Sequence, residues 1–216
     1  MLSGELDADL GHNTSAIADF KKSVQLDSDL PDAYNALGST LAESGNLGEA
    51  EKAFRSALQV RPDLADAQAN LGMLLASKDE LAEAAGHFER ALSAKPESTV
   101  ARCNYAITLA RLNRPDYAER QLRLAIQIDP KLAEAYDLLG TLVKNKGHSE
   151  AAIRQYREAL RVRPDFSRAS LDLGIALAGR GDINGAVDNL RRAAGGKDPG
   201  IQEQALRVLA QIGRQK

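Results

Sequence analysis

Apolar and polar positions along this chain recur with a fixed period of 34 residues. Between Ala65 and Ser98 the apolar residues form two stripes with the three- and four-residue spacing of amphipathic helices, one around Leu71–Leu75 and one from Leu81 to Leu92. The same pattern starts, without insertion or deletion, at Pro31, Ala65, Thr99, Ala133 and Ser167. A fixed period of this length is typical of a repeat architecture.

Small and large residues keep fixed places in every copy. In the copy that begins at Ala65, the recurring positions are Leu71, Gly72, Leu75, Ala84, Phe88, Ala91 and Pro96. Glycine or alanine in the columns of Gly72, Ala84 and Ala91 predicts that two helix backbones approach closely there. The proline column predicts the end of the second helix, because proline cannot continue one.

A turn residue separates the two apolar stripes of each copy. Its column consists of Gly45, Asp79, Asn113, Gly147 and Gly181. These residue types tolerate the left-handed conformation that commonly ends a helix. Each copy is therefore predicted to be a helix, a tight turn and a second helix, and the chain is predicted to be all-α.

The two ends of the chain depart from the full pattern. Residues 1–30 read as a copy without its start, with Gly11 in the turn column and Ala16 and Phe20 in the second helix. Residues 201–216 predict an amphipathic capping helix whose apolar face is Ile201, Ala205, Val208, Leu209 and Ile212. One continuous domain is expected, made of a partial copy at 1–30, full copies at 31–64, 65–98, 99–132, 133–166 and 167–200, and the capping helix at 201–216.

The recurring residues resemble the tetratricopeptide repeat family. The resemblance rests on the Leu-Gly pairs 37–38, 71–72, 139–140 and 173–174, on the Ala, Phe/Tyr and Ala columns, and on the closing prolines. The family often has a large aromatic early in the first helix, which only Tyr34 and Tyr136 supply; Gln68, Arg102 and Ser170 suggest softer packing. The resemblance implies a right-handed α-α superhelix, a solenoid whose first helices line a concave groove for a protein or peptide partner.

Composition narrows the function further. The chain has a net charge of −2, with residues 1–108 at −8 and residues 109–216 at +6, and one cysteine. This asymmetry could orient a charged partner or favour head-to-tail self-association; the alternative is a merely solvated surface. Few aromatics stand near the basic residues, no apolar run would span a membrane, and no signal peptide is visible, so we expect no nucleic-acid or membrane partner and a cytoplasmic location.

No catalytic constellation is visible in the sequence. The histidines, His12, His87 and His148, have no carboxylate or cysteine at ligand spacing, and Cys103 has no histidine partner, so neither a metal, a cofactor nor an enzyme activity is expected.

Inward-facing columns of the first helices supply the candidate site. The predicted peptide-binding residues are Asn35, Ser39, Asn70, Met73, Asn104, Ile107, Arg111, Thr141, Lys144, Asp172 and Ile175. Asn70 and Asn104 could form an amide ladder along a peptide backbone, because a carboxamide both donates and accepts; alternatively they tie neighbouring first helices together. Met73, Ile107 and Ile175 offer apolar contacts.

The predicted function is a protein-interaction scaffold that binds an extended or helical peptide segment in the groove. Two alternatives stay open. The chain could be the substrate-recruiting arm of a larger enzyme, such as a glycosyltransferase, or a self-assembly module that forms homo-oligomers through its incomplete first copy.

Overall fold

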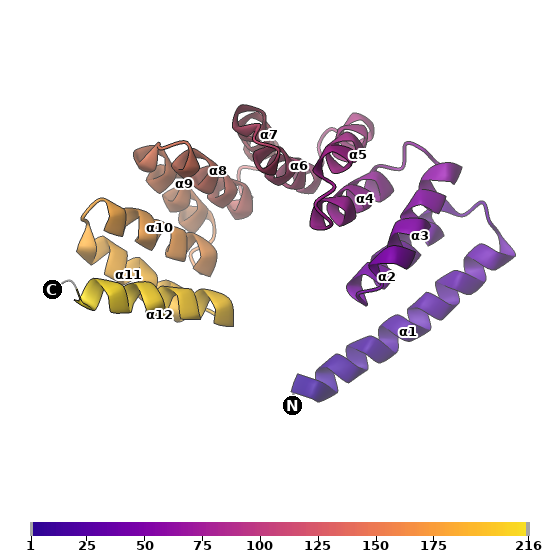
Figure 1. The fold of residues 1–216 in the computed structure, drawn as a ribbon, viewed down its shortest axis with the longest axis horizontal. Helices are drawn as coiled ribbons and strands as arrows, with labels where there is room; N and C mark the ends of the chain where they lie inside the picture. Colours follow the sequence, from indigo (N-terminus) through magenta and orange to yellow (C-terminus); the bar gives the residue numbers. More distant parts are fainter. Residues whose placement is uncertain (1, 215–216) are drawn as a thin grey trace. The chain divides into compact units, whose positions relative to one another are not determined.

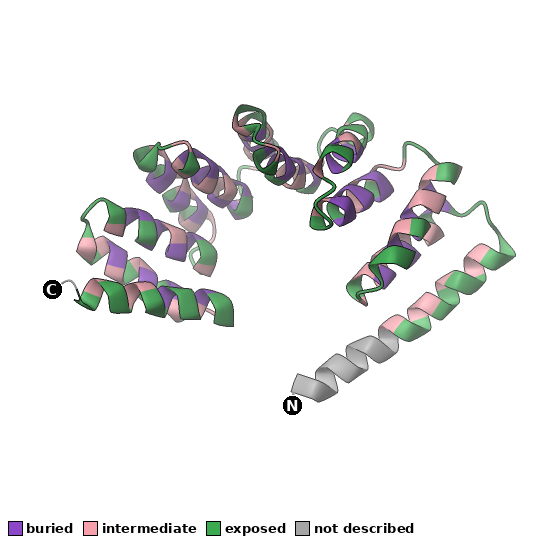
Figure 2. Ribbon diagram, viewed as in Figure 1, coloured by how far each residue is buried: buried purple, intermediate pink, exposed green. Residues whose placement is uncertain are grey.

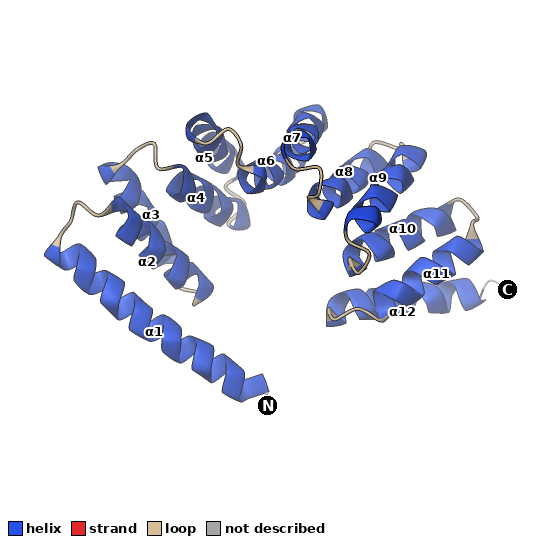
Figure 3. Cartoon of the chain, turned by 180° about the vertical axis from the view of Figure 1, so that it is seen from behind, coloured by secondary structure: helices blue, strands red, loops and turns tan. Residues whose placement is uncertain are grey.

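The computed structural model describes residues 2–214, and side chains from residue 13 onward. Over this part of the chain the structure consists of twelve α-helices joined by loops, with no strand (Figures 1 and 3). The helices are α1 (Leu2–Leu26), α2 (Pro31–Glu43), α3 (Leu47–Val60), α4 (Ala65–Ser77), α5 (Leu81–Ala94), α6 (Thr99–Arg111), α7 (Pro115–Ile128), α8 (Ala133–Asn145), α9 (Ser149–Val162), α10 (Ser167–Gly179), α11 (Ile183–Ala194) and α12 (Pro199–Arg214). The predicted all-α fold is confirmed.

The helices gather into two compact units, Met1–Leu112 (unit 1) and Asn113–Lys216 (unit 2). In unit 1, α2 and α3 form one hairpin and α4 and α5 another; α1 packs on α2, and α6 packs on α5 and α4. In unit 2, α8 pairs with α9 and α10 with α11; α7 packs on α8, and α12 on α11 and α10. Within each unit, the buried faces of paired helices point toward each other (Figure 2). This stacking of hairpins on their neighbours is the arrangement of an all-α solenoid.

The turn column adopts the predicted backbone conformation in all five full copies. The φ angle is positive at Gly45 (78°), Asp79 (66°), Asn113 (58°), Gly147 (85°) and Gly181 (82°). After α2, for example, the Gly45 N–H donates to the Ala42 carbonyl at 3.0 Å, and the Asn46 N–H donates to the Leu41 carbonyl at 2.8 Å. This pair of bonds satisfies helix-end carbonyls and turns the chain sharply into the second helix.

The glycine column makes room for the large side chain of the facing helix. A Cβ atom added at Gly140 would lie 2.6 Å from the Tyr156 ring, and one added at Gly38 would lie 2.5 Å from the Phe54 ring. At Gly72 the added atom would also lie 3.3 Å from the backbone oxygen of Ala84, as expected for closely approaching helices. Tyr156, Phe54 and Phe88 are almost completely buried, and these rings form the centres of three hairpins; Leu122 and Leu190 hold the same position in the other two copies.

The helices before the four prolines end two residues earlier than the prolines themselves. α3, α5, α7 and α9 end at Val60, Ala94, Ile128 and Val162, ahead of Pro62, Pro96, Pro130 and Pro164. The residues before Pro62, Pro130 and Pro164 are extended; Arg61, for example, has φ −133° and ψ 93°. Proline disfavours the helical conformation at the residue that precedes it, which explains why the helix ends there.

Early in two first helices, where the family often has an aromatic, a polar side chain forms a hydrogen bond to the preceding loop. The Gln68 amide donates to the Pro62 carbonyl at 2.7 Å, and the Arg102 guanidinium donates to the Pro96 carbonyl at 2.6 Å. Gln68 is only 3% exposed. These bonds fix the loop between consecutive hairpins, so the expected softening of the packing is offset at these two copies.

Exposed ion pairs repeat at equivalent places within the copies, between the start of the first helix and the residue after the second. Arg61 contacts Asp32 at 3.1 Å in unit 1, and Arg163 contacts Glu134 at 2.7 Å in unit 2, three periods further along. Each exposed pair contributes roughly 0–1 kcal/mol, so these pairs add little to overall stability.

Of the two predictions made for the ends of the chain, the structure agrees with the one for the C-terminal end. The final amphipathic helix is confirmed: Ile201 and Ala205 are buried with Leu171, Leu190 and Ala193, while Val208, Leu209 and Ile212 pack partly against them. The turn expected at Gly11 is wrong, because α1 is one continuous helix from Leu2 to Leu26. A lone glycine lowers helix stability by only about 1 kcal/mol, which is not enough to end a helix by itself.

Candidate functional site

Three predicted residues of unit 1 lie together where α4 crosses α2. The Asn70 Nδ2 donates to Asn35 Oδ1 at 3.0 Å and to Ser39 Oγ at 3.3 Å. The Ser39 hydroxyl in turn donates to the Asn35 carbonyl at 3.1 Å. The amide nitrogen of Asn70 is therefore engaged in joining two first helices.

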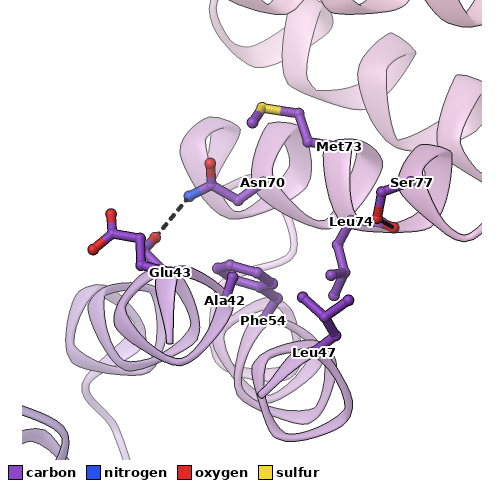
Figure 4. A pocket seen from close by; sticks show the side chains of 9 residues that line it. Ala42, Glu43, Leu47, Phe54, Asn70, Met73, Leu74 and Ser77 are labelled. Carbon is purple, nitrogen blue, oxygen red and sulfur yellow. Dashed lines mark hydrogen bonds between the residues drawn. The ribbon is translucent and has the colours of Figure 1, made fainter. Parts of the chain in front are cut away.

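A mainly apolar pocket of about 310 Å³ lies beside this hydrogen-bonded group. Its walls come from α2, α3 and α4, and the lining residues are Ser39, Ala42, Glu43, Leu47, Phe54, Asn70, Met73, Leu74 and Ser77. Figure 4 shows Leu47 and Leu74 pointing toward each other at one end, while Asn70 points toward α2 at the other. Such a pocket accepts an apolar side chain next to a polar edge.

Two apolar side chains extend this surface along consecutive first helices. Met73 on α4 is 44% exposed, and Ile107 on α6, one period later, is 41% exposed. Asn104, one turn before Ile107, is half-buried. Arg111 instead binds the end of α4, donating to the Ala76 carbonyl at 2.7 Å and to Asp79 Oδ1 at 2.9 Å, which stabilises the carbonyl end of that helix.

The remaining predicted residues belong to unit 2, on α8 and α10. Thr141 Oγ1 lies 3.2 Å from the hydroxyl of the buried Tyr156. Lys144 Nζ lies 3.9 Å from Asp172 Oδ1, too far for a hydrogen bond. Ile175, one turn after Asp172, is 37% exposed. The structure thus groups Asn35, Ser39, Asn70 and Met73 in one unit, and Thr141, Lys144, Asp172 and Ile175 in the other.

Asp137 on α8 belongs to the second group, although the sequence did not single it out. It is 7% exposed, and its Oδ1 has no hydrogen-bond partner among the described residues. Burial and the negative charge of Asp172 raise the pKa of Asp137 to about 7, while burial also raises the pKa of Asp172. The signal that could have found Asp137 is its register: Asp137 and Asp172 stand three periods after Asn35 and Asn70.

His87 has a buried partner that the sequence did not reveal. Its Nδ1 lies 2.6 Å from Gln68 Oε1, and burial lowers its pKa. The expectation that no carboxylate stands near this histidine is wrong, because Glu83 lies one turn earlier, 3.7 Å from Nε2. Within the described residues, no three His, Cys, Asp or Glu side chains gather as metal ligands would.

Among the described residues, every helix is too short or too polar to cross a bilayer.

The repeated hairpins, their left-handed turns and their glycine–ring contacts define a class of helical repeat protein, and sequence profiles identify the family. A profile described as "Tetratricopeptide repeat" matches residues 35–99 and 138–200, a second with the same description matches 74–142, and one described as "TPR repeat" matches 4–45. The chain therefore belongs to the tetratricopeptide repeat family. The family and the fold support a general role as a protein-interaction scaffold, and its members are generally non-enzymatic.

Solved structures share the fold at low sequence identity. The TPR protein YrrB, described as having an unusual peptide-binding site, is 23% identical with a TM-score of 0.66, covering 88% of this chain and 97% of its own. PilW, a type IV pilus biogenesis factor, is 19% identical with a TM-score of 0.81, covering 91% and 90%. PilF of Pseudomonas aeruginosa is 21% identical with a TM-score of 0.74, covering 87% and 92%. No curated protein matches the chain by sequence.

Proposed function

We propose that the chain binds a peptide segment of a partner protein, in extended or helical form, on the first-helix face of unit 1. The observation that carries this proposal is the pair Met73 and Ile107, which are exposed at the same position of consecutive first helices. Met73 also lines the apolar pocket between α2, α3 and α4. Exposed apolar side chains that recur in register mark an interaction surface more strongly than scattered ones do. Methionine adds adaptability, because its unbranched side chain adjusts to different partners.

Asn70 has a positioning role in this proposal. Because its amide nitrogen is bound to Asn35 and Ser39, it holds α4 against α2 and thereby fixes the edge of the pocket. A peptide-backbone ladder of Asn70 and Asn104 is a separate part of the hypothesis. It is tested by Asn70→Ala combined with Asn104→Ala, and unchanged peptide affinity would remove the ladder while leaving the apolar surface in place.

The test begins with peptides selected from a random displayed library on the purified full chain. Their affinities are then measured by fluorescence anisotropy for the wild type and for Met73→Ser plus Ile107→Ser. Full burial of each side chain contributes roughly 1.5–3 kcal/mol. Because about 1.4 kcal/mol corresponds to a tenfold change, we expect at least a tenfold loss of affinity.

Ile128→Ser is the matched control. Ile128 is 42% exposed, close to Ile107, but lies at the end of a second helix, α7. Selected peptides should bind this variant like the wild type. Equal weakening by Ile128→Ser, or full affinity of the Met73/Ile107 variant, would contradict the proposal.

A further inference from the structure

Unit 2 carries a chemically altered version of the hydrogen-bonded asparagine pair of unit 1. In unit 1, Asn70 donates to Asn35 at 3.0 Å, so one amide satisfies the other. Three periods later the same two positions hold Asp137 on α8 and Asp172 on α10. Ionised carboxylates only accept hydrogen bonds, so the donor that joins the first pair is missing from the second.

Among the residues whose side chains are described, no neighbour supplies that donor. The Oδ1 atom of Asp137 is buried and has no hydrogen-bond partner among the described residues. The Lys144 ammonium stays 3.9 Å from Asp172, and the Thr141 hydroxyl, which stands where Ser39 does in unit 1, pairs with Tyr156. A buried acceptor without a partner costs about 1–3 kcal/mol, which favours a guest that donates.

We propose that the Asp137–Asp172 pair receives the ammonium or guanidinium group of a lysine or arginine side chain from a bound polypeptide. This inference rests on the proposed function, in that it assigns polypeptide binding to the first helices of unit 2 as well. Asp172, whose side chain is 15% exposed, forms the accessible edge, and the more deeply buried Asp137 forms the floor. Ile175, one turn further along α10 and 37% exposed, offers apolar contact to the aliphatic stem of the guest.

The charges around the pair give the binding a pH dependence. The groups that face Asp137 are Lys144 on α8, Tyr156 on α9, Arg163 after α9, and Arg168 and Asp172 on α10. The three cations lower the pKa of Asp137 only partly, and it remains about 7. Below that pH a proton occupies the site, so a cationic guest must displace it. Affinity should rise with pH toward 7, by up to about tenfold per pH unit for one released proton.

The experiment uses the full chain and two small probes, N-acetyl-argininamide and its neutral analogue N-acetyl-citrullinamide. Methyl resonances of Ile175 and Thr141 and the carboxyl carbons of Asp137 and Asp172 are followed by NMR at pH 6 and pH 8. We expect saturable shifts with argininamide, stronger at pH 8, at an affinity on the order of millimolar. Equal shifts with citrullinamide, or a pair that titrates near pH 7 yet leaves argininamide unbound, would overturn the proposal.

The chain itself suggests the variant to compare. Asp137→Asn combined with Asp172→Asn recreates the pair that Asn35 and Asn70 form, so this variant should fold, and argininamide should bind at least tenfold more weakly. Undiminished binding would refute the assignment. Failure of the proposed function is distinguishable, because it is read from peptides on Met73 and Ile107 variants, whereas argininamide reports on unit 2 alone.

Discussion

Replacing Gly140 by alanine should destabilise the α8–α9 hairpin, although alanine is the better helix former. The added Cβ would lie 2.6 Å from Cε1 and 2.7 Å from Cδ1 of Tyr156, closer than real contacts allow. Tyr156 is completely buried and its hydroxyl lies 3.2 Å from Thr141, so the ring has little room to move. Overpacking of this kind costs about 1–3 kcal/mol, and the gain in helix propensity offsets about 0.8–1 kcal/mol. We expect a net loss of up to about 2 kcal/mol.

The assay is urea unfolding followed by far-UV circular dichroism, together with amide hydrogen exchange. Exchange is needed because a repeat protein can open locally, and faster exchange should be confined to α8, α9 and their neighbours. Gly86→Ala is the matched control: Gly86 lies inside α5, an added Cβ there meets nothing within 4 Å, and the variant should gain about 0.5–1 kcal/mol. If Gly140→Ala were as stable as Gly86→Ala, the ring could not fill the space assigned to it.

Three further variants test the turn, a helix cap and a buried carboxylate. Gly147→Ala should lower the free energy of unfolding by about 1–2 kcal/mol in urea, because φ is 85° at this turn. Ser98→Ala should cost about 1 kcal/mol and speed amide exchange at the start of α6, because the Ser98 hydroxyl accepts from the Ala101 N–H at 3.3 Å. Asp137→Asn should stabilise the chain increasingly between about pH 4 and pH 7, by at most about 1.4 kcal/mol per pH unit, and level off above. The folded carboxyl, with its pKa of about 7 against an ordinary 3.8, keeps its proton through this range, so the wild type loses stability there as pH rises. Urea midpoints that show no such trend would contradict the raised pKa.

The period of the sequence was enough to predict the hairpins, because the signals for helix, turn and close contact are local. Gly45, Asp79 and their equivalents had to be left-handed for the chain to reverse within a few residues, and residue type reveals this. The hydrogen bonds that offset the softer packing at Gln68 and Arg102 were not predicted. These bonds to proline carbonyls six residues earlier depend on the path of the loop, which no column of residue types records.

For the candidate site, the sequence predicted which helix positions the residues occupy, but not the contacts that their side chains make. Met73 and Ile107 are exposed, and their place in a binding groove stays a prediction. The role of Asn70 depended on whether its amide reached a partner or a neighbouring helix, and its amide nitrogen reaches Asn35 on α2. Arg111 reaches back to the end of α4, because a long side chain spans the distance to the previous copy. Asp137 was missed because one carboxylate in a helix reads as solvated, and its burial follows from how α10 packs on α8.

Comparison of the two units separates what the fold requires from what the proposed cation site requires. Asn35 and Asn70 show that the same backbone positions accommodate a self-sufficient amide pair, so the fold does not require carboxylates at Asp137 and Asp172. A pair of buried carboxylates without a donor weakens the folded state, and choices of that kind are found where a binding site needs them. Two measurements therefore test one arrangement, the absence of a donor between α8 and α10. The first is the stability gained by Asp137→Asn, and the second is the cation affinity lost by Asp137→Asn plus Asp172→Asn.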